Sequence, residues 1–312
     1  MSAGDTPGEN PPSRTLVDRN SLDAFSIGPH SDGVDVRIHD SFDEFRATAE
    51  PLYRRDPVVN TVELTLLNAG KVPADSLLLS VSGADVPVAA ALQTPPYPLV
   101  CNGIPSHISR MVATELVRFR PDLNGVRGRR DLAMAFADAW ASVSGHPGTV
   151  TTREMLYRLG TLRAPQGVSG VHRHATRADR ALLADWVELF FVETFSHQRD
   201  DAAGERFVDN ANSVGDRFVL WEVDGTPVSM AMVRAPTAGV SRIGPVFTLQ
   251  SVRGRGHGSA VTAAAATLAR RDGVDDVVLF ADLAKPTSNA IYQRIGFEAV
   301  ADSMRVEFAD GA

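Results

Sequence analysis

The chain has 312 residues, a formal net charge of −7 and 44% hydrophobic residues. This length predicts about two domains, and the acidic balance argues against a dedicated nucleic-acid-binding protein, which normally presents a basic surface. Cys101 is the only cysteine, which excludes an intrachain disulfide and a multi-cysteine zinc site. We expect it to be a buried small hydrophobic residue, and we assign no metal site.

Residues 1–33 are rich in Pro, Gly, Ser and Asp, and they lack the basic start and apolar run of a signal peptide. We expect them to form a flexible tail. No apolar stretch approaches the ~20 residues needed to cross a bilayer. The sequence therefore predicts a cytoplasmic protein without membrane contact.

Residues 34–165 are predicted to form a first domain. VDVRIHD alternates as a strand does, and Ser41 and Glu44 have capping-box spacing before a helical pattern. The next predicted elements are a helix after Pro57, strands at SLLLSV, VPVAAALQT and YPLVCNG, helices at SHISRMVATELVRF and RRDLAMAFADAWASVSG, and a strand at TVTTREMLYRLGTL. The Pro and Gly content of Arg163 to Gly170 predicts a linker.

Residues 166–312 are predicted to form a second domain with a similar order of elements. They are a strand at VHRHA, a helix capped by Thr176 with Asp179, a short helix near ERFVDNANSV, strands at RFVLWEV, PVSMAMVRA and SRIGPVFTL, a helix ending at Gly273, a strand at DVVLFADL, a helix at TSNAIYQRIG and a strand at FEAVADSMRVEF. This order predicts an α+β fold with a mixed, mainly antiparallel sheet flanked by helices.

A short internal similarity connects the two domains. PVAAALQTPP from Pro87 and PVSMAMVRAP from Pro227 align without gaps, each on a predicted strand after a Gly turn. Chance similarity between two buried strands is one explanation. The matching order of elements favours the other, a duplicated fold.

The stretch SVRGRGHGSAVTAAAATLARR, from Ser251 to Arg271, predicts an anion site. Its alternating glycines allow backbone N–H groups to converge, and the following helix directs its positive end to the same point. Ser259 stands where a dinucleotide fingerprint needs its last glycine, and no G-K-[ST] motif follows. A phosphate or pyrophosphate is the expected ligand, and the alternative is a tight turn with solvated arginines.

The strand before this loop contains Gly244 and Pro245 in IGPVFT. Proline removes a donor from the strand ladder and glycine favours a bulge, so we expect the strand to splay from its neighbour. Splaying would leave main-chain groups of Phe247, Thr248 and Leu249 free to pair with an extended, amide-bearing ligand. A plain strand end is the alternative.

These residues resemble the GNAT superfamily of acetyl-CoA-dependent N-acetyltransferases. Its pyrophosphate motif R/Q-x-x-G-x-G/A is met by Arg253, Gly256 and Gly258, its preceding strand by VFT, and its last helix by SNAIYQRIGF. The resemblance extends from about Val168 to the C-terminus. It implies tandem GNAT-like domains with a splayed central strand, the first domain being degenerate, and acetyl-CoA bound in the second domain between diverging strands.

The resemblance also implies roles for individual residues. Cofactor contacts fall on Val246, Phe247, Thr248, Arg253, Gly254, Arg255, Gly256, His257, Gly258, Ser259 and Asn289. Tyr292 would act as general acid and protonate the leaving thiolate. For Asn289 a helix-capping role is equally open, and Lys285 stands where many relatives have an asparagine.

The general base has no assignment. The family often places a Glu near the start of the splayed strand, but SRIGPVFT contains no carboxylate. Four side chains are candidates by chemistry alone, namely Glu222, Glu193, His197 and His174. Each is more typical of an ordinary surface or strand-edge group.

The first domain lacks the glycine-arginine loop, so we expect its cofactor site to be lost. It would wall the acceptor cleft, extend the sheet or support a homodimer. Arg127, Arg129 and Arg130 would bind an anion or form a solvated helix start.

Three functions follow from the sequence. The first is an N-acetyltransferase that uses acetyl-CoA and a small-molecule or peptide amine, with the second domain catalytic. The second is a non-catalytic acyl-CoA-binding or sensor protein. The third is an interaction protein whose loop binds another phosphate.

Overall fold

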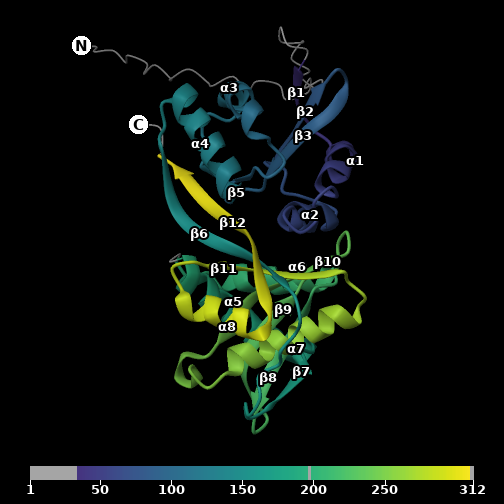
Figure 1. The fold of residues 1–312 in the computed structure, drawn as a ribbon, viewed down its shortest axis with the longest axis vertical. Coiled ribbons are helices and arrows are strands. Elements are labelled where there is room, and N and C mark those ends of the chain that lie inside the picture. The colour runs from purple at the N-terminus through teal and green to yellow at the C-terminus, as the bar shows by residue number, and fades with distance from the viewer. Residues whose placement is uncertain (1–33, 196–197, 310–312) are drawn as a thin grey trace, which may run out of the picture.

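The computed structural model describes residues 34–195 and 198–309, so the predicted tail lies outside the described residues. They form one 12-stranded mixed sheet with helices packed on it. We call β1 to β6 the N-terminal half and β7 to β12 the C-terminal half (Figure 1).

The N-terminal half contains β1 (Val34–Ile38), α1 (Phe42–Tyr53), α2 (Thr61–Asn68), β2 (Leu77–Gly83), β3 (Val86–Gln93), β4 (Leu99–Val100), the 3-10 turn η1 (Ser106–Ile108), α3 (Ser109–Phe119), β5 (Gly125–Arg129), α4 (Arg130–Ser144) and β6 (Gly148–Leu159). The Ser41 cap is confirmed, since its side chain accepts from the Glu44 amide. The helix start expected at the arginine cluster is confirmed for Arg129 and Arg130, since α4 begins at Arg130 with Arg129 as its N-cap. Arg127 lies instead in β5, which pairs with β4 and β12.

The C-terminal half contains β7 (Val171–His174), the 3-10 turn η2 (Arg177–Asp179), α5 (Arg180–Phe195), α6 (Asp201–Ser213), β8 (Arg217–Val223), β9 (Thr226–Val233), β10 (Val240–Thr248), the 3-10 turn η3 (Gln250–Val252), α7 (His257–Arg271), β11 (Asp276–Asp282), α8 (Pro286–Ile295) and β12 (Phe297–Phe308). The Thr176 and Asp179 capping box is confirmed, on the turn that leads into α5.

The two halves exchange their last strands. The sheet order is β1-β2-β3-β4-β5-β12-β6-β11-β10-β9-β8-β7. Thus β12, from the C-terminal half, lies between β5 and β6, while β6, from the N-terminal half, lies between β11 and β12. Figure 1 shows these two long strands running side by side from one half to the other.

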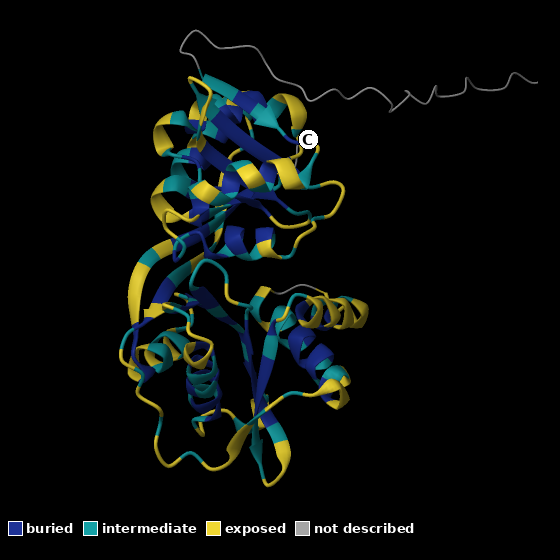
Figure 2. Cartoon of the chain, turned by 90° about the vertical axis from the view of Figure 1, so that its right-hand side faces the viewer, coloured by how far each residue is buried: buried dark blue, intermediate teal, exposed yellow. Residues whose placement is uncertain are grey.

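The hydrophobic cores follow this exchange. Met304, Val306 and Phe308 of β12 are buried in the core of the N-terminal half, and Tyr157 and Leu159 of β6 are buried in the core of the C-terminal half. Figure 2 shows the buried residues gathered at both ends of the molecule, with the long strands connecting them. Each half therefore depends on the other for part of its core.

The halves repeat one another in detail. β2 and β8 begin at residues 77 and 217, and β3 and β9 begin at 86 and 226. Both pairs are thus separated by 140 residues, from 217 − 77 and 226 − 86. Both hairpins turn through two left-handed residues, Ala84 with Asp85 and Asp224 with Gly225. In both hairpins the strand register shifts at the same place near the end of the first strand, between Val81 and Ser82 and between Trp221 and Glu222. The fold is therefore duplicated.

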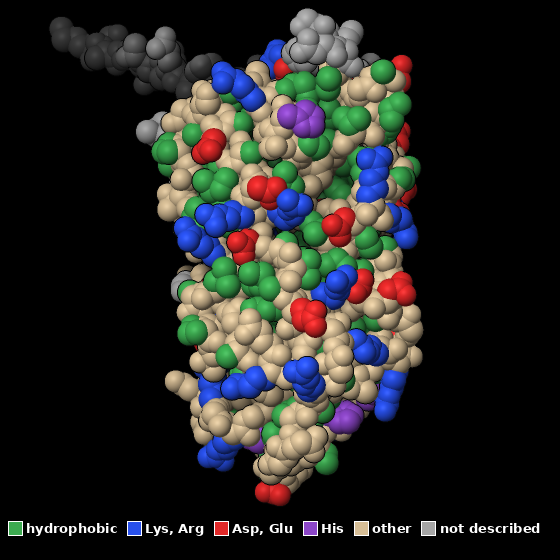
Figure 3. Space-filling model, in the orientation of Figure 1, with side chains coloured by type: hydrophobic (Ala, Val, Ile, Leu, Met, Phe, Trp, Pro, Cys, Tyr) green, Lys and Arg blue, Asp and Glu red, His purple; other side chains and the backbone are tan. Residues whose placement is uncertain are grey.

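Acidic and basic side chains are interspersed over the face seen in Figure 3. No helix among the described residues is long and apolar enough to span a membrane. Cys101 is fully buried, as expected.

We predict that Val306→Ala lowers the free energy of unfolding of the whole protein by about 2 kcal/mol, because it removes two methyl groups from a packed core. Val306 is 1% exposed and lies on β12 within the N-terminal core. Denaturant unfolding followed by tryptophan fluorescence and by far-UV circular dichroism would measure this change.

The control is Val300→Ala on the same strand, where the side chain is 40% exposed and little change is expected. The two probes should give one coincident transition in all three proteins. Separate transitions for the two halves would contradict the exchanged core.

Candidate active site

The glycine-arginine loop connects β10 to α7. Gly254 and Gly256 have φ of 80° and 85°, in the left-handed region that favours glycine, and Gly256 caps α7. A Cβ on Gly256 would lie 2.9 Å from Cγ2 of Val168. The glycine at this position therefore permits both the turn and the close approach of a neighbouring segment.

The loop presents unpaired backbone donors. The first N–H groups of a helix have no acceptor within it, and the amides of residues 254–259 have no acceptor elsewhere among the described residues. The positive end of α7 adds to their field. This arrangement fits an anionic group, as a phosphate cradle requires.

The two arginines of the loop and its histidine lie in different environments. The Arg253 Nε donates to the carbonyl oxygen of Thr248 at 2.9 Å, and its Nη2 lies 2.6 Å from Oε2 of Glu193 on α5. Arg255 is exposed. His257 is buried, and both burial and the nearby Arg255 lower its pKa, which keeps the imidazole neutral near pH 7.

The strand before the loop separates from its neighbour, as expected. β10 pairs with β11 only through residues 240–242, and its pairing with β9 shifts register between Ile243 and Val246, around Gly244 and Pro245. Beyond this point residues 246–248 pair with β9 alone. Their β11-facing side is thus free of strand partners. The expectation of free main-chain groups is wrong for Leu249, whose amide donates to the carbonyl oxygen of Val228, and the Thr248 carbonyl oxygen accepts from Arg253.

The helix α8 lies on the other side of this gap. Tyr292 is half-buried against the C-terminal core, with its ring 6.2 Å from that of Phe297. Burial raises the pKa of its phenol to about 12. The hydroxyl has no hydrogen-bond partner among the residues that the structure describes.

Asn289, one turn before Tyr292, is held within the protein. Its amide donates to the carbonyl oxygens of Asp282 at 2.7 Å and Lys285 at 2.9 Å, and its Oδ1 accepts from the Tyr157 hydroxyl at 2.9 Å. Both amide N–H groups are therefore used internally. Asn289 does not cap α8, whose N-cap is Lys285 without a side-chain cap bond, so its side chain instead fixes the start of α8 to β6 and to the end of β11.

Comparison with known proteins fits this geometry. Residues 180–297 match the model of the Acetyltransferase (GNAT) family. The C-terminal half carries a GNAT domain. No curated protein is detectably similar in sequence.

Solved structures match most of the chain. A GCN5-related N-acetyltransferase from Sphaerobacter thermophilus has 16% identity and a TM-score of 0.60, and the match covers 90% of this chain and 97% of that chain. A tandem GNAT protein from the clavulanic acid biosynthesis pathway has 14% identity and a TM-score of 0.57, with 89% and 99% covered. A GNAT-family acetyltransferase from Colwellia psychrerythraea has 10% identity and a TM-score of 0.58, with 88% and 99% covered. These similarities show the fold, which is that of tandem GNAT proteins.

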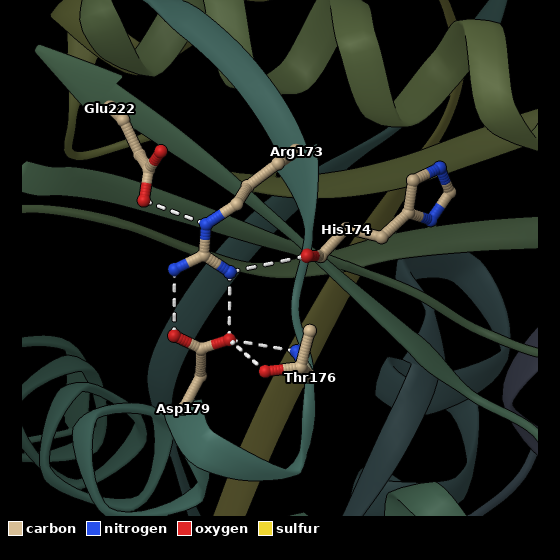
Figure 4. A network of polar contacts seen from close by, with 5 residues as sticks. All are labelled: Arg173, His174, Thr176, Asp179 and Glu222. Carbon is tan, nitrogen blue, oxygen red and sulfur yellow. Dashed lines mark hydrogen bonds and ion pairs between the residues drawn. The ribbon is translucent and has the colours of Figure 1, made fainter. Parts of the chain in front are cut away.

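Glu222, one of the candidates for the general base, has a structural role away from the gap between β10 and β11. The Glu222 Oε1 accepts from Nε of Arg173 at 2.7 Å, and the same guanidinium binds both carboxylate oxygens of Asp179, at 2.7 and 2.8 Å (Figure 4). Arg173 lowers the pKa of Asp179 to about 2. Glu222 therefore helps to join β7 and β8 to the start of α5.

The other base candidates are dispersed. His174 lies on the edge strand β7, exposed, with its ring directed away from the Arg173 network (Figure 4). Glu193 is paired with Arg253 at the loop, and His197 lies outside the described residues.

The N-terminal half has no corresponding gap. The Cys101 amide donates to the carbonyl oxygen of Arg127 at 2.9 Å, and Oδ1 of Asn102 accepts from the Arg129 amide at 2.7 Å. These bonds continue the contact between the two segments past the end of β4. The Arg129 and Arg130 guanidinium groups lie 2.7 Å from Asp131 and 4.0 Å from Asp302, so both have carboxylate neighbours.

Two features of the site have no local sequence signal. The first is Tyr157, 2% exposed, which belongs to β6 and reaches α8 only through the strand exchange. The second is a buried charged cluster between the halves that includes Glu63 on α2 and Arg242 on β10. Both depend on contacts between residues more than 100 positions apart in the chain.

We predict that Tyr157→Phe lowers the free energy of unfolding by about 1 kcal/mol, because Oδ1 of Asn289 loses its buried donor. Thermal unfolding followed by calorimetry would measure the change. Tyr292→Phe is the matched control, since its hydroxyl has no partner to lose, and its effect should stay within about 0.5 kcal/mol. Equal destabilisation by the two substitutions would contradict this account of α8.

Proposed function

We propose that the protein is an acetyl-CoA-dependent N-acetyltransferase whose C-terminal half is catalytic. One observation carries the proposal. Along the chain, the open side of β10 leads directly into the unpaired amides at the N-terminus of α7, and the half-buried phenol of Tyr292 on α8 packs against the same core as Val246 of β10. This succession suits a long ligand with an anionic group at one end and a thioester at the other.

The pyrophosphate would be held by the amides of residues 254–259, with Arg253 and Arg255 adding positive charge. Residues 246–248 would pair with the amides of the pantetheine arm on their β11-facing side, with the Thr248 carbonyl oxygen becoming available when Arg253 turns to the phosphate. Asn289 would act by holding α8 in place. We keep the predicted division of the chain at residues 165 and 166, while β6 and β12 cross it in space.

Acetyl-CoA supplies an activated acetyl group. An acceptor amine forms the new N–C bond, the C–S bond breaks, and the sulfur leaves with the electron pair. Tyr292 donates its proton to that sulfur. Because burial raises the pKa of Tyr292 to about 12, the phenol keeps its proton at neutral pH until the sulfur requires it.

We predict that Arg253→Ala weakens acetyl-CoA binding about tenfold, as expected for the loss of a charge-assisted contact to phosphate. Calorimetric titration with acetyl-CoA measures the dissociation constant, with desulfo-CoA and ATP as comparison ligands. Arg271→Ala, at the exposed far end of the same helix, is the control and should bind as the parent does. Absence of acetyl-CoA binding by the parent would overturn the proposed function.

We predict that Tyr292→Phe lowers kcat by about 100-fold while the dissociation constant of acetyl-CoA changes less than twofold, because the phenol acts only as the thiolate forms. Thiol release from acetyl-CoA, measured with a panel of free amino acids, polyamines and amino sugars, gives kcat. Unchanged turnover would remove Tyr292 as the acid. Binding by the parent without turnover of any amine would favour an acyl-CoA-binding protein instead.

A further inference from the structure

One face of the sheet at the gap is covered by the N-terminal half. Val58 packs in one buried cluster with Leu156, Val240 and Val278, and the half-buried Phe280 packs against that cluster. The segment leading into α2 thus covers β10, β11 and β6 where β10 and β11 part.

Strand alternation places charged groups on this same face. Side chains two residues apart on a strand point the same way, so Arg242 shares the face of Val240. It is the last residue of β10 that pairs with β11. Nearby, the Arg127 guanidinium lies 4.9 Å from the Phe280 ring centroid and 2.8 Å from Oε2 of Glu154.

Glu63 enters this region from α2, which contacts β10. Its side chain is completely buried, and neither carboxylate oxygen has a hydrogen-bond partner among the described residues. Nη1 of Arg242 is likewise buried without a partner. A buried carboxyl without a close hydrogen bond costs several kcal/mol, and the nearby Asn102 side chain and guanidinium groups of Arg127 and Arg242 offset this cost only in part.

The groups around Glu63 come from four other elements. They are Tyr53 of α1, Cys101 and Asn102 after β4, Arg127 of β5 and Arg242 of β10. Burial raises the pKa of Glu63 to about 7, against the opposing effects of its own backbone amide, the Asn102 side chain and the two guanidinium groups. A group with this pKa both accepts and releases a proton near neutral pH.

We propose that Glu63 of the N-terminal half is the general base of the GNAT domain and that the acceptor amine binds between the halves, on the covered face of the gap. This inference rests on the proposed function. It goes beyond that function by giving the N-terminal half a catalytic residue. It also explains why β10 has no carboxylate of its own at the point where it separates from β11, and has Arg242 there instead.

In the proposed step the acceptor nitrogen forms its bond to the acetyl carbon and gives up one proton. Glu63, ionised beforehand, takes that proton, while the sulfur leaves and takes the proton of Tyr292. Glu63 and Tyr292 then return to their starting forms by exchange with solvent. Arg242 and Arg127 favour the ionised form of Glu63 before the reaction.

The test compares the parent full-length protein with Glu63→Gln and Glu63→Asp. Thiol release with the best amine of the panel should show kcat at least about 100-fold lower in Glu63→Gln, with partial activity in Glu63→Asp. The rise of kcat/KM through pH about 7 should be absent from Glu63→Gln. Acetyl-CoA affinity should change less than twofold.

Glu115→Gln is the matched control. Glu115 is a 2% exposed glutamate of the same half, on α3, outside this cluster. Its substitution should leave kcat and the pH profile unchanged. Glu63→Gln with kcat within threefold of the parent would overturn the inference and leave the proposed function intact, whereas a parent that binds acetyl-CoA and acetylates no amine would overturn both.

A second measurement needs no acceptor. Because the folded-state pKa of Glu63 lies above its ordinary value, its contribution to stability is present at low pH and is lost as pH rises through about 7. The thermal midpoint of the parent should therefore fall relative to that of Glu63→Gln between about pH 5 and pH 8. A difference that does not change with pH would mean that the carboxyl is solvated, and would overturn the inference.

Discussion

The antiparallel pairing of β6 with β12 is the interaction on which the rest of the molecule depends. It extends over nearly the full length of both strands and places each beside a strand of the other half. Each core is therefore completed by side chains from the other half, such as Phe308, which stacks on Trp140 at 5.5 Å. The same pairing brings Tyr157 to α8, so the geometry around Tyr292 is set partly by the N-terminal half.

One local difference between the duplicated halves is whether the fourth and fifth strands separate. In the C-terminal half, Gly244 and Pro245 shift the register of β10 and open one side of its backbone. In the N-terminal half, Asn102 uses its side chain to continue the contact with Arg129, the last residue of β5. A bulge thus produces a gap in one half, and a side-chain amide closes it in the other.

Features that depend on neighbours in sequence could be predicted. The loop from Arg253 to Gly258, the bulge at Gly244 and the Ser41 cap all follow from residues a few positions apart, whose backbone preferences decide the structure. The strand β5 could not, because GVRGR has little apolar character and is stabilised by β4 and β12 on either side. Glu63 and Tyr157 are equally hidden, because only the fold brings them to the gap.

The ion pair between Arg253 and Glu193 is compatible with the proposed anion site at the loop. Both side chains are about four-tenths exposed, at 44% and 40%, and an exposed pair of this kind contributes only about 0 to 1 kcal/mol. A phosphate offers a doubly charged partner together with the amides of the loop, and these outweigh one screened carboxylate. Glu193 therefore neutralises Arg253 in the free protein without holding it against such a ligand. If Arg253 turned to an anion, Glu193 would remain close to Lys285, whose Nζ donates to the Glu193 carbonyl oxygen at 3.4 Å, so the end of α5 would keep a contact with the start of α8.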